Sequence, residues 1–133
     1  MKKLIVPLFA AILALNYSCN RQPSDHMETG NETVFIHTVF FWLNDHVTED
    51  EKKQFESGLE KLGTVSSIYK FWYGKPAGTP REVVDNSYDY AWIVHFSSAE
   101  AQDKYQEDPV HLEFVEKYSH LWQEVKVYDT LLK

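Results

Sequence analysis

The sequence is poor in cysteine, in basic residues and in long apolar runs, and each shortage argues against a class of protein. Its 133 residues include one cysteine, Cys19, so no disulfide can form within the chain and its core must hold the fold. Lys and Arg number 13 against 20 Asp and Glu, which disfavours nucleic acid as a partner. The longest apolar run, residues 4–15, is shorter than the roughly 20 residues of a membrane-spanning helix.

The start of the chain has the pattern of an export signal. A basic MKK precedes the apolar run, and the small Ser18 then stands directly before Cys19. This arrangement resembles a bacterial lipoprotein cleavage site, at which the cysteine is lipidated, although Asn16 occupies a position that is usually aliphatic. The alternative is an ordinary cleaved secretory signal with a leftover cysteine. We therefore predict a lipoprotein-type signal peptide at 1–18, with Cys19 as the lipidation site.

The remaining chain divides into a tether and one domain. Residues 19–32 are polar, contain Pro and Gly and show no apolar period, which predicts a flexible tether. Residues 33–133 carry nearly all the aromatic side chains and are predicted to form a single domain. Together these features predict an exported protein of the bacterial cell envelope, held to a membrane by its lipid anchor.

The domain alternates strand and helix patterns. Capping sequences start at Thr48, Ser97 and Asp108, and Pro109 suits the first position of a helix. The predicted order is strand 33–43, a helix between Thr48 and Gly63, strand 64–75, a loop at 76–86, strand 87–96, a helix from Ser97 to about Gln106, a second helix from Asp108, and strand 124–132. Two split β-α-β units of this kind predict an α+β fold, a four-stranded antiparallel sheet with helices on one face.

The first predicted strand is apolar on both faces. Its odd positions include Val39 and Phe41, and its even positions include Ile36 and Phe40. A strand with one face in water would alternate apolar and polar residues. Helices can cover only one face, so we predict that a second copy of the chain covers the other, giving a homodimer through the sheet.

Four polar residues are candidates for a site. Tyr105 and His111 flank the proline in YQEDPVH, and a helix start disfavours a charged imidazole at His111. His37 shares a strand face with apolar residues and needs a polar partner, which Asp129 could supply. A phenol, an imidazole and an Asp–His pair around an apolar pocket can move a proton beside a carbonyl. The alternative is that Asp108 only caps a helix and both rings are amphipathic residues at a bend.

The same residues allow an alternative interpretation, in which they bind a metal ion. His37, His111 and Asp129 could form a two-histidine, one-carboxylate set, but they lack close ligand spacing such as H-E-x-x-H. No phosphate loop, nucleophile elbow or cofactor motif is present in the sequence. We therefore predict no metal and no cofactor.

Over residues 35–130 the chain resembles the stress-responsive α/β-barrel (Dabb) family. The resemblance is carried by His37, by Asp45 with the VTEDEKKQF that follows, by WYGK at 72–75, by SYDYAWIVHFSSAEAQDKYQEDPVHLEF at 87–114, and by Tyr128-Asp129. It implies a ferredoxin-like, dimeric α/β barrel without a metal, with a pocket between each sheet and its helices.

The resemblance also implies roles for individual residues. In a plant polyketide cyclase of the family, a tyrosine and a histidine perform acid/base chemistry, at positions that match Tyr105 and His111. His37 and Asp129 match other polar pocket residues, and the wall is matched by Phe55, Trp92, Val94, Phe114, Trp122, Val125 and Val127. Asp108 departs from the usual H-P-x-H, and Glu56 and Gln102 are polar where the cyclase lining is apolar.

The sequence thus predicts an envelope-anchored homodimer with a small apolar pocket. Cyclase- or lyase-like acid/base chemistry on a small hydrophobic carbonyl compound is one function. The alternatives are non-catalytic binding of a small ligand, as in a stress-response protein, and a purely structural dimer. The export signal argues against the polyketide reaction itself, because that pathway is cytoplasmic.

Overall fold

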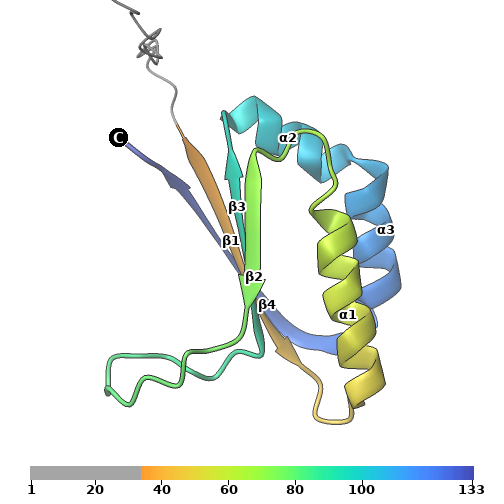
Figure 1. Ribbon diagram of the computed structural model, residues 1–133, viewed down its shortest axis with the longest axis vertical. Helices are drawn as coiled ribbons and strands as arrows, with labels where there is room; N and C mark the ends of the chain where they lie inside the picture. Colours follow the sequence, from red (N-terminus) through yellow and green to blue (C-terminus); the bar gives the residue numbers. More distant parts are fainter. Residues whose placement is uncertain (1–33) are drawn as a thin grey trace, which may run out of the picture.

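The computed structural model describes residues 34–133, so the predicted signal peptide, Cys19 and the tether lie outside the described residues. Figure 1 shows a sheet with its helices on one side. The elements are β1 (Phe35–Leu43), α1 (Glu49–Leu62), β2 (Lys70–Gly74), β3 (Tyr90–Phe96), α2 (Ala99–Glu107), α3 (Pro109–Tyr118), the 3-10 turn η1 (Ser119–Leu121) and β4 (Trp122–Leu131). Within 34–133, no helix has the length and apolar character needed to cross a membrane.

The four strands form one antiparallel sheet in the order β2-β3-β1-β4. The two central strands, β3 and β1, are thus far apart in sequence, and both ends of the domain meet at β1 and β4. In the register, His37 lies opposite Val94 on one side and Asp129 on the other. This is the predicted α+β class, with a four-stranded antiparallel sheet and helices on one face.

The predicted helix starts at Thr48 and Asp108 are confirmed. Thr48 and Glu51 form a reciprocal capping box at α1, and Gly63 ends that helix with its N–H bonded to Leu59. The Asp108 carboxylate accepts the Val110 N–H, with Pro109 at the first turn of α3. The start of α2 was misplaced by one residue, because Ser98 rather than Ser97 caps it.

Two predicted strands are shorter in the structure. Residues 64–69 make turns rather than strand, since Val65 and Ile68 donate to the carbonyls of Leu62 and Val65. β3 begins at Tyr90 rather than at residue 87, and just before it the Asp89 carboxylate accepts the Leu43 N–H from β1. Tyr88 packs against Phe40, whereas Tyr90 packs against Phe55, so the two rings do not share a face as predicted.

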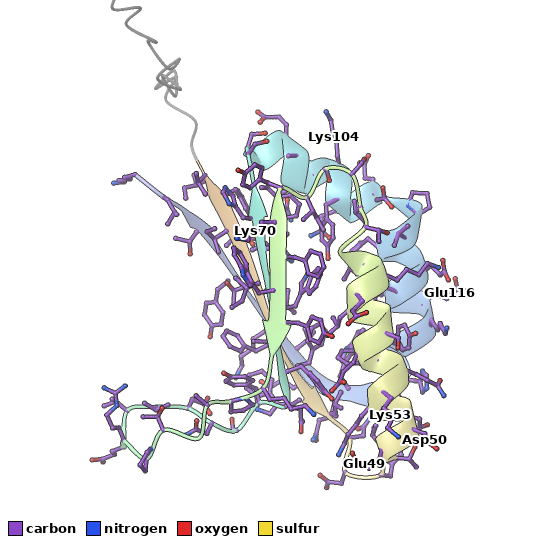
Figure 2. The ribbon with its side chains drawn as sticks, in the orientation of Figure 1. Glu49, Asp50, Lys53, Lys70, Lys104 and Glu116 are labelled. Carbon is purple, nitrogen blue, oxygen red and sulfur yellow. The ribbon has the colours of Figure 1, made fainter. Side chains whose placement is uncertain are left out.

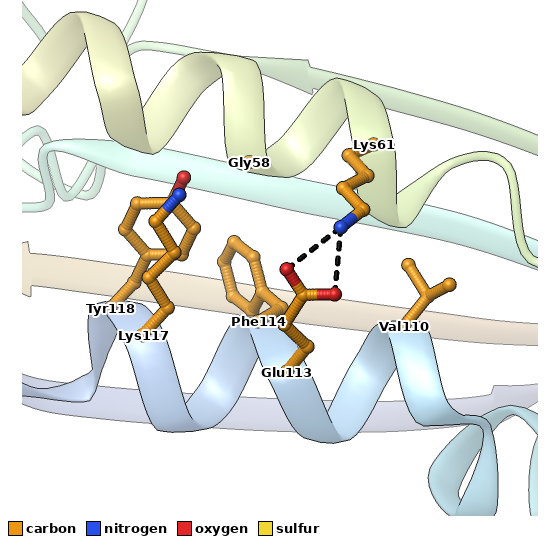
Figure 3. Close-up of a pocket in the computed structure, with 7 residues that line it drawn as sticks. All are labelled: Gly58, Lys61, Val110, Glu113, Phe114, Lys117 and Tyr118. Atoms are coloured by element: carbon orange, nitrogen blue, oxygen red, sulfur yellow. Dashed lines mark hydrogen bonds and ion pairs between the residues drawn. The ribbon is translucent and has the colours of Figure 1, made fainter.

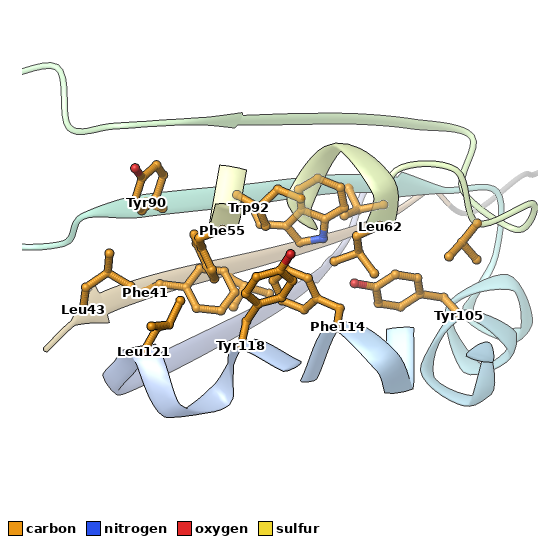
Figure 4. Packing of buried hydrophobic residues seen from close by; sticks show 14 of the residues in the cluster. Phe41, Leu43, Phe55, Leu62, Tyr90, Trp92, Tyr105, Phe114, Tyr118 and Leu121 are labelled. Atoms are coloured by element: carbon orange, nitrogen blue, oxygen red, sulfur yellow. The ribbon is translucent and has the colours of Figure 1, made fainter. Parts of the chain in front are cut away.

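An aromatic cluster fills the space between the sheet and the helices (Figure 4). Phe55 is fully buried at its centre, with ring centroids 5.2 to 6.2 Å from five other aromatic rings, those of Phe41, Tyr90, Phe114, Tyr118 and Trp122. Burying one such side chain contributes roughly 1.5–3 kcal/mol. The described domain therefore has a core that requires no disulfide.

Helices α1 and α3 pack closely because of one glycine. A Cβ at Gly58 would fall inside van der Waals contact with the Tyr118 ring. Beside this contact, the Lys61 ammonium bridges both Glu113 carboxylate oxygens at 2.7 and 2.8 Å (Figure 3). The hollow between α1 and α3 has a volume of only about 20 Å³, enough for a single water molecule. This helix pair is a packing contact and leaves no room for a ligand.

None of the helices formed by residues 34–133 covers the second face of the sheet. The register places Trp72, Ile93, Thr38 and Tyr128 in one row across it. Trp72 and Tyr128 are 46% and 57% exposed, and Phe40 packs edge-on to Tyr128. By contrast, charged side chains point outward from the helices (Figure 2), among them Glu49, Asp50, Lys53 and Glu116. The uncovered sheet face thus carries aromatic rings, with Lys70 and Lys126 lying over Trp72 and Trp42, whereas the outer face of the helices is mainly charged.

Candidate functional site

A cavity of about 220 Å³ lies between the covered face of the sheet and the α2–α3 region. Its walls come from β1, β3, β4 and the three helices. The residues that line it are His37, Val39, Phe41, Leu62, Trp92, Tyr105, Gln106, His111, Phe114, Val115, Trp122, Val125 and Val127. No carboxylate, ammonium or guanidinium group is among them, so most of the wall is apolar.

Strand alternation positions the sheet side of this cavity. His37, Val39 and Phe41 follow one another on the covered face of β1. Val127 and Val125 stand opposite Val39 and Phe41 on β4 and extend the same apolar surface. His37 is therefore the one polar member of this row, at the end near α2.

His37 has the partner that its burial requires. Its Nδ1 lies 2.6 Å from Asp129 Oδ1, directly across the β1–β4 ladder. The imidazole is buried and the carboxylate is about half exposed. A carboxylate accepts hydrogen bonds, so the contact assigns the proton to Nδ1. Nε2 of His37 is left as the free ring nitrogen.

The helix break in YQEDPVH serves the second histidine. Because α2 ends at Glu107, the Gln106 carbonyl is released from the helical ladder. Val110, which would donate to it in a continuous helix, donates to Asp108 Oδ1 instead. His111 Nδ1 lies 3.1 Å from the freed Gln106 oxygen. A carbonyl oxygen can only accept, so Nδ1 carries the proton and Nε2 is the free base.

The environment keeps the His111 imidazole neutral. Partial burial lowers its pKa from the usual value, and the neighbouring His37 lowers it further, while the Gln106 carbonyl and Asp108 act in the opposite direction. The net direction is downward, so the ring carries no charge near pH 7. A neutral imidazole with a free Nε2 is a general base at that pH.

Tyr105 lies between the two histidines. Its side chain is 1% exposed, and its ring centroid is 4.6 Å from that of His111 and 5.9 Å from that of His37. Burial raises the pKa of the phenol, and the Trp92 indole N–H partly offsets this rise. The phenol is therefore protonated throughout the neutral range and can donate a hydrogen bond.

The structure brings together most of the predicted site residues. One cavity is lined by Tyr105, His111, His37, Trp92, Phe114 and Trp122. Asp129 is not in the lining, but its carboxylate is hydrogen-bonded to His37. Phe55 and Val94 do not line the cavity, because both are fully buried within the hydrophobic core. Glu56 does not line it either, since it accepts the Tyr90 O–H at 2.6 Å.

Five lining residues were not predicted: Val39, Phe41, Leu62, Gln106 and Val115. The alternation of β1 from His37 was a signal for the first two. The role of Gln106 lies in its backbone oxygen, which no side-chain pattern reveals. Across residues 34–133, no group of three potential metal ligands comes together, so His111 does not join the His37–Asp129 pair in the alternative metal set.

The sequence and the fold match known proteins. The model of the stress responsive A/B barrel domain, Dabb, matches residues 35–131. No curated protein matches the sequence. A hydroxynitrile lyase from Passiflora edulis superposes with a TM-score of 0.68 at 16% identity, covering 77% of this chain and 95% of that one.

Two bacterial structures are similar to a comparable degree. A dimeric ferredoxin-like protein of unknown function from Thermobifida fusca has a TM-score of 0.65 at 20% identity, over 77% of this chain and 93% of that one. A Dabb family protein with a ferredoxin-like fold from Mesorhizobium loti has a TM-score of 0.63 at 18% identity, over 76% and 98%. At these identities the likeness concerns the fold.

Proposed function

This chain belongs to the stress-responsive A/B barrel (Dabb) family, and we propose that it is a homodimer whose cavity performs cofactor-independent proton transfer on a small hydrophobic carbonyl compound. The observation that carries the proposal is the contact of Tyr105 with His111 at the polar end of an apolar cavity. The fold alone supports many functions in unrelated proteins. The argument therefore rests on this pair of groups and on their protonation states.

The reaction follows from those states. His111 Nε2 takes a proton from the carbon next to the carbonyl, and the electrons of that C–H bond form the C=C bond of an enolate. Negative charge gathers on the former carbonyl oxygen, where the Tyr105 O–H donates a hydrogen bond to it. Return of the proton from the imidazolium to carbon, or to a different atom of the intermediate, completes the reaction and restores neutral His111.

The lining restricts the ligand. The apolar walls favour an alkyl or aryl body, and the polar groups at one end suit a single oxygen-bearing head. No cationic side chain is present to offset a carboxylate or phosphate, whose burial would be costly. A neutral aromatic ketone or aldehyde of modest size fits these conditions.

Proton exchange at carbon tests this function directly. The wild-type domain in D₂O is expected to introduce deuterium beside the carbonyl of one or more members of a panel of small aryl alkyl ketones, followed by NMR. The rate should rise with pH to a plateau, with its midpoint below the usual histidine pKa of about 6.5, because burial lowers the pKa of His111 and only the neutral ring is a base. Binding of a panel member without exchange would support the alternative, a non-catalytic ligand-binding or stress-response protein.

A lipid anchor is the proposed means of localisation, supported by the basic start, the short apolar run and the Ser18-Cys19 pair. When the full chain is expressed in bacteria with labelled palmitate, label is expected in the wild type and not in Cys19→Ala. Ser18→Ala is the matched control, since it keeps a small residue before the cysteine. Equal labelling of wild type and Cys19→Ala would contradict the anchor.

A further inference from the structure

The Trp92 indole N–H is a buried donor without a hydrogen bond of good geometry to any described residue. Trp92 lies in β3 at 1% exposure, and its ring forms part of the cavity wall. Leaving such a donor unpaired is unfavourable, because it has lost its hydrogen bond to water and gained none in return. Such groups are rare in folded proteins, and each calls for a physical explanation, of which a role in catalysis is one. Trp92 therefore needs an acceptor.

The Tyr105 phenol is the acceptor that its surroundings offer. Both side chains are 1% exposed and line the same cavity, Tyr105 from α2 and Trp92 from β3 (Figure 4). Figure 4 shows the Tyr105 hydroxyl directed from α2 toward the part of the cluster that holds the indole nitrogen. The Trp92 indole N–H also acts to lower the pKa of the Tyr105 phenol, which is the direction expected of a hydrogen-bond donor to its oxygen.

We propose that Trp92 is a positioning residue for Tyr105: its indole N–H donates to the phenol oxygen, so that the single phenol proton is directed to the carbonyl oxygen of the ligand. A phenol has one proton and two lone pairs, and an N–H that occupies a lone pair leaves the proton free to point elsewhere. The same donor makes the phenol a better hydrogen-bond donor, because successive bonds polarise one another. This inference rests on the proposed function for its consequence, but the hydrogen bond itself does not.

An NMR experiment tests the hydrogen bond without any turnover. In ¹⁵N-labelled protein, the four indole signals are assigned by Trp→Phe variants. Tyr105→Phe is expected to move the Trp92 indole proton upfield and to speed its exchange with solvent, because its acceptor is gone. The other three indole signals should stay in place. An unchanged Trp92 signal in Tyr105→Phe would overturn the proposal even if proton exchange at carbon is found.

Kinetics test the positioning role. Trp92→Phe is expected to lower the deuterium exchange rate about five- to tenfold. This factor corresponds to the loss of roughly 1 kcal/mol of transition-state stabilisation, the contribution of one hydrogen bond. In the Tyr105→Phe background the same change should have no further effect, since Trp92 acts through the phenol. A loss that is the same size in both backgrounds would mean that Trp92 contacts the ligand itself, which would overturn the proposal.

Two further variants separate positioning from packing. Benzothienylalanine at position 92 keeps the bicyclic ring and replaces the N–H by sulfur, so it tests the donor even if Trp92→Phe folds poorly. Trp122→Phe alters another ring of the same wall, and its effect should add to that of Tyr105→Phe. If no panel compound takes up deuterium but Tyr105→Phe shifts the Trp92 indole signal, the proposed function fails while the Trp92–Tyr105 hydrogen bond stands.

Discussion

Replacing Tyr105 by Phe or His111 by Gln is expected to reduce proton exchange at carbon by a factor of about 10² to 10⁴, with little loss of stability. General acid or base groups contribute this much when they act in the transition state. Tyr105→Phe keeps the buried ring, and His111→Gln keeps a hydrogen-bonding side chain of similar reach. Each should therefore change the free energy of unfolding by only about 1 kcal/mol.

The measurement pairs exchange rates with urea unfolding for each variant. Tyr69→Phe and His120→Gln are matched controls, because they make the same chemical changes at exposed positions away from the cavity. Both controls should exchange at the wild-type rate. A Tyr105→Phe or His111→Gln protein that retains wild-type exchange, or that is unfolded, would count against an acid/base role for the pair. The double variant should be little slower than the slower single one, since the two groups act in one step.

Much of the fold was predictable from short patterns. The Thr48 cap, the Gly63 stop and the Asp108-Pro109 start each depend on hydrogen bonds within a few residues, so a local reading is sufficient. The two apolar faces of β1 likewise follow from alternation along one strand. These features together imply the antiparallel sheet with its helices on one side.

The wrong predictions concern the ends of strands, whose positions depend on contacts between residues far apart in the sequence. Residues 64–69 have strand-like composition, but the chain turns there before β2 begins. The Phe71 ring of β2 packs so close to Gly63 that a Cβ at this position would collide with it. Tyr88 follows the strand pattern, but it packs on Phe40 across the sheet, with the ring centroids 4.8 Å apart. Strand ends of this kind depend on pairing partners that a single segment does not display.

The candidate site shows the same division. Alternation and family resemblance together indicated Tyr105, His111 and the His37–Asp129 pair. They did not separate Phe55, which fills the core, from the wall of the cavity, because both positions demand a large apolar side chain. The role of the Gln106 carbonyl could not be predicted either, since it comes from the break between α2 and α3, which leaves this oxygen for His111, and not from the Gln106 side chain.

Thr38→Arg is expected to convert the protein from a dimer to a monomer or to aggregates. Thr38 is central on the uncovered sheet face, between Ile93 and Tyr128 in the register. If a second copy covers this face, the arginine is buried without a counter-ion, which costs roughly 3–5 kcal/mol. That cost corresponds to a loss of about 10²- to 10⁴-fold in dimer affinity. The aromatic side chains on this face support a partner that is itself apolar there, and a second copy of the chain meets that condition.

Sedimentation of the domain at micromolar concentration makes the test. The wild type should have twice its sequence mass, and Thr38→Arg the single mass if it remains soluble. Leu112→Arg adds the same charge at a side chain that is 55% exposed on α3, so it should stay dimeric and folded. A folded, monomeric wild type would end the dimer proposal, and so would a Thr38→Arg dimer of wild-type stability. The cavity lies on the opposite face of the sheet, so a soluble Thr38→Arg monomer that still exchanged protons would show that one chain completes the site by itself.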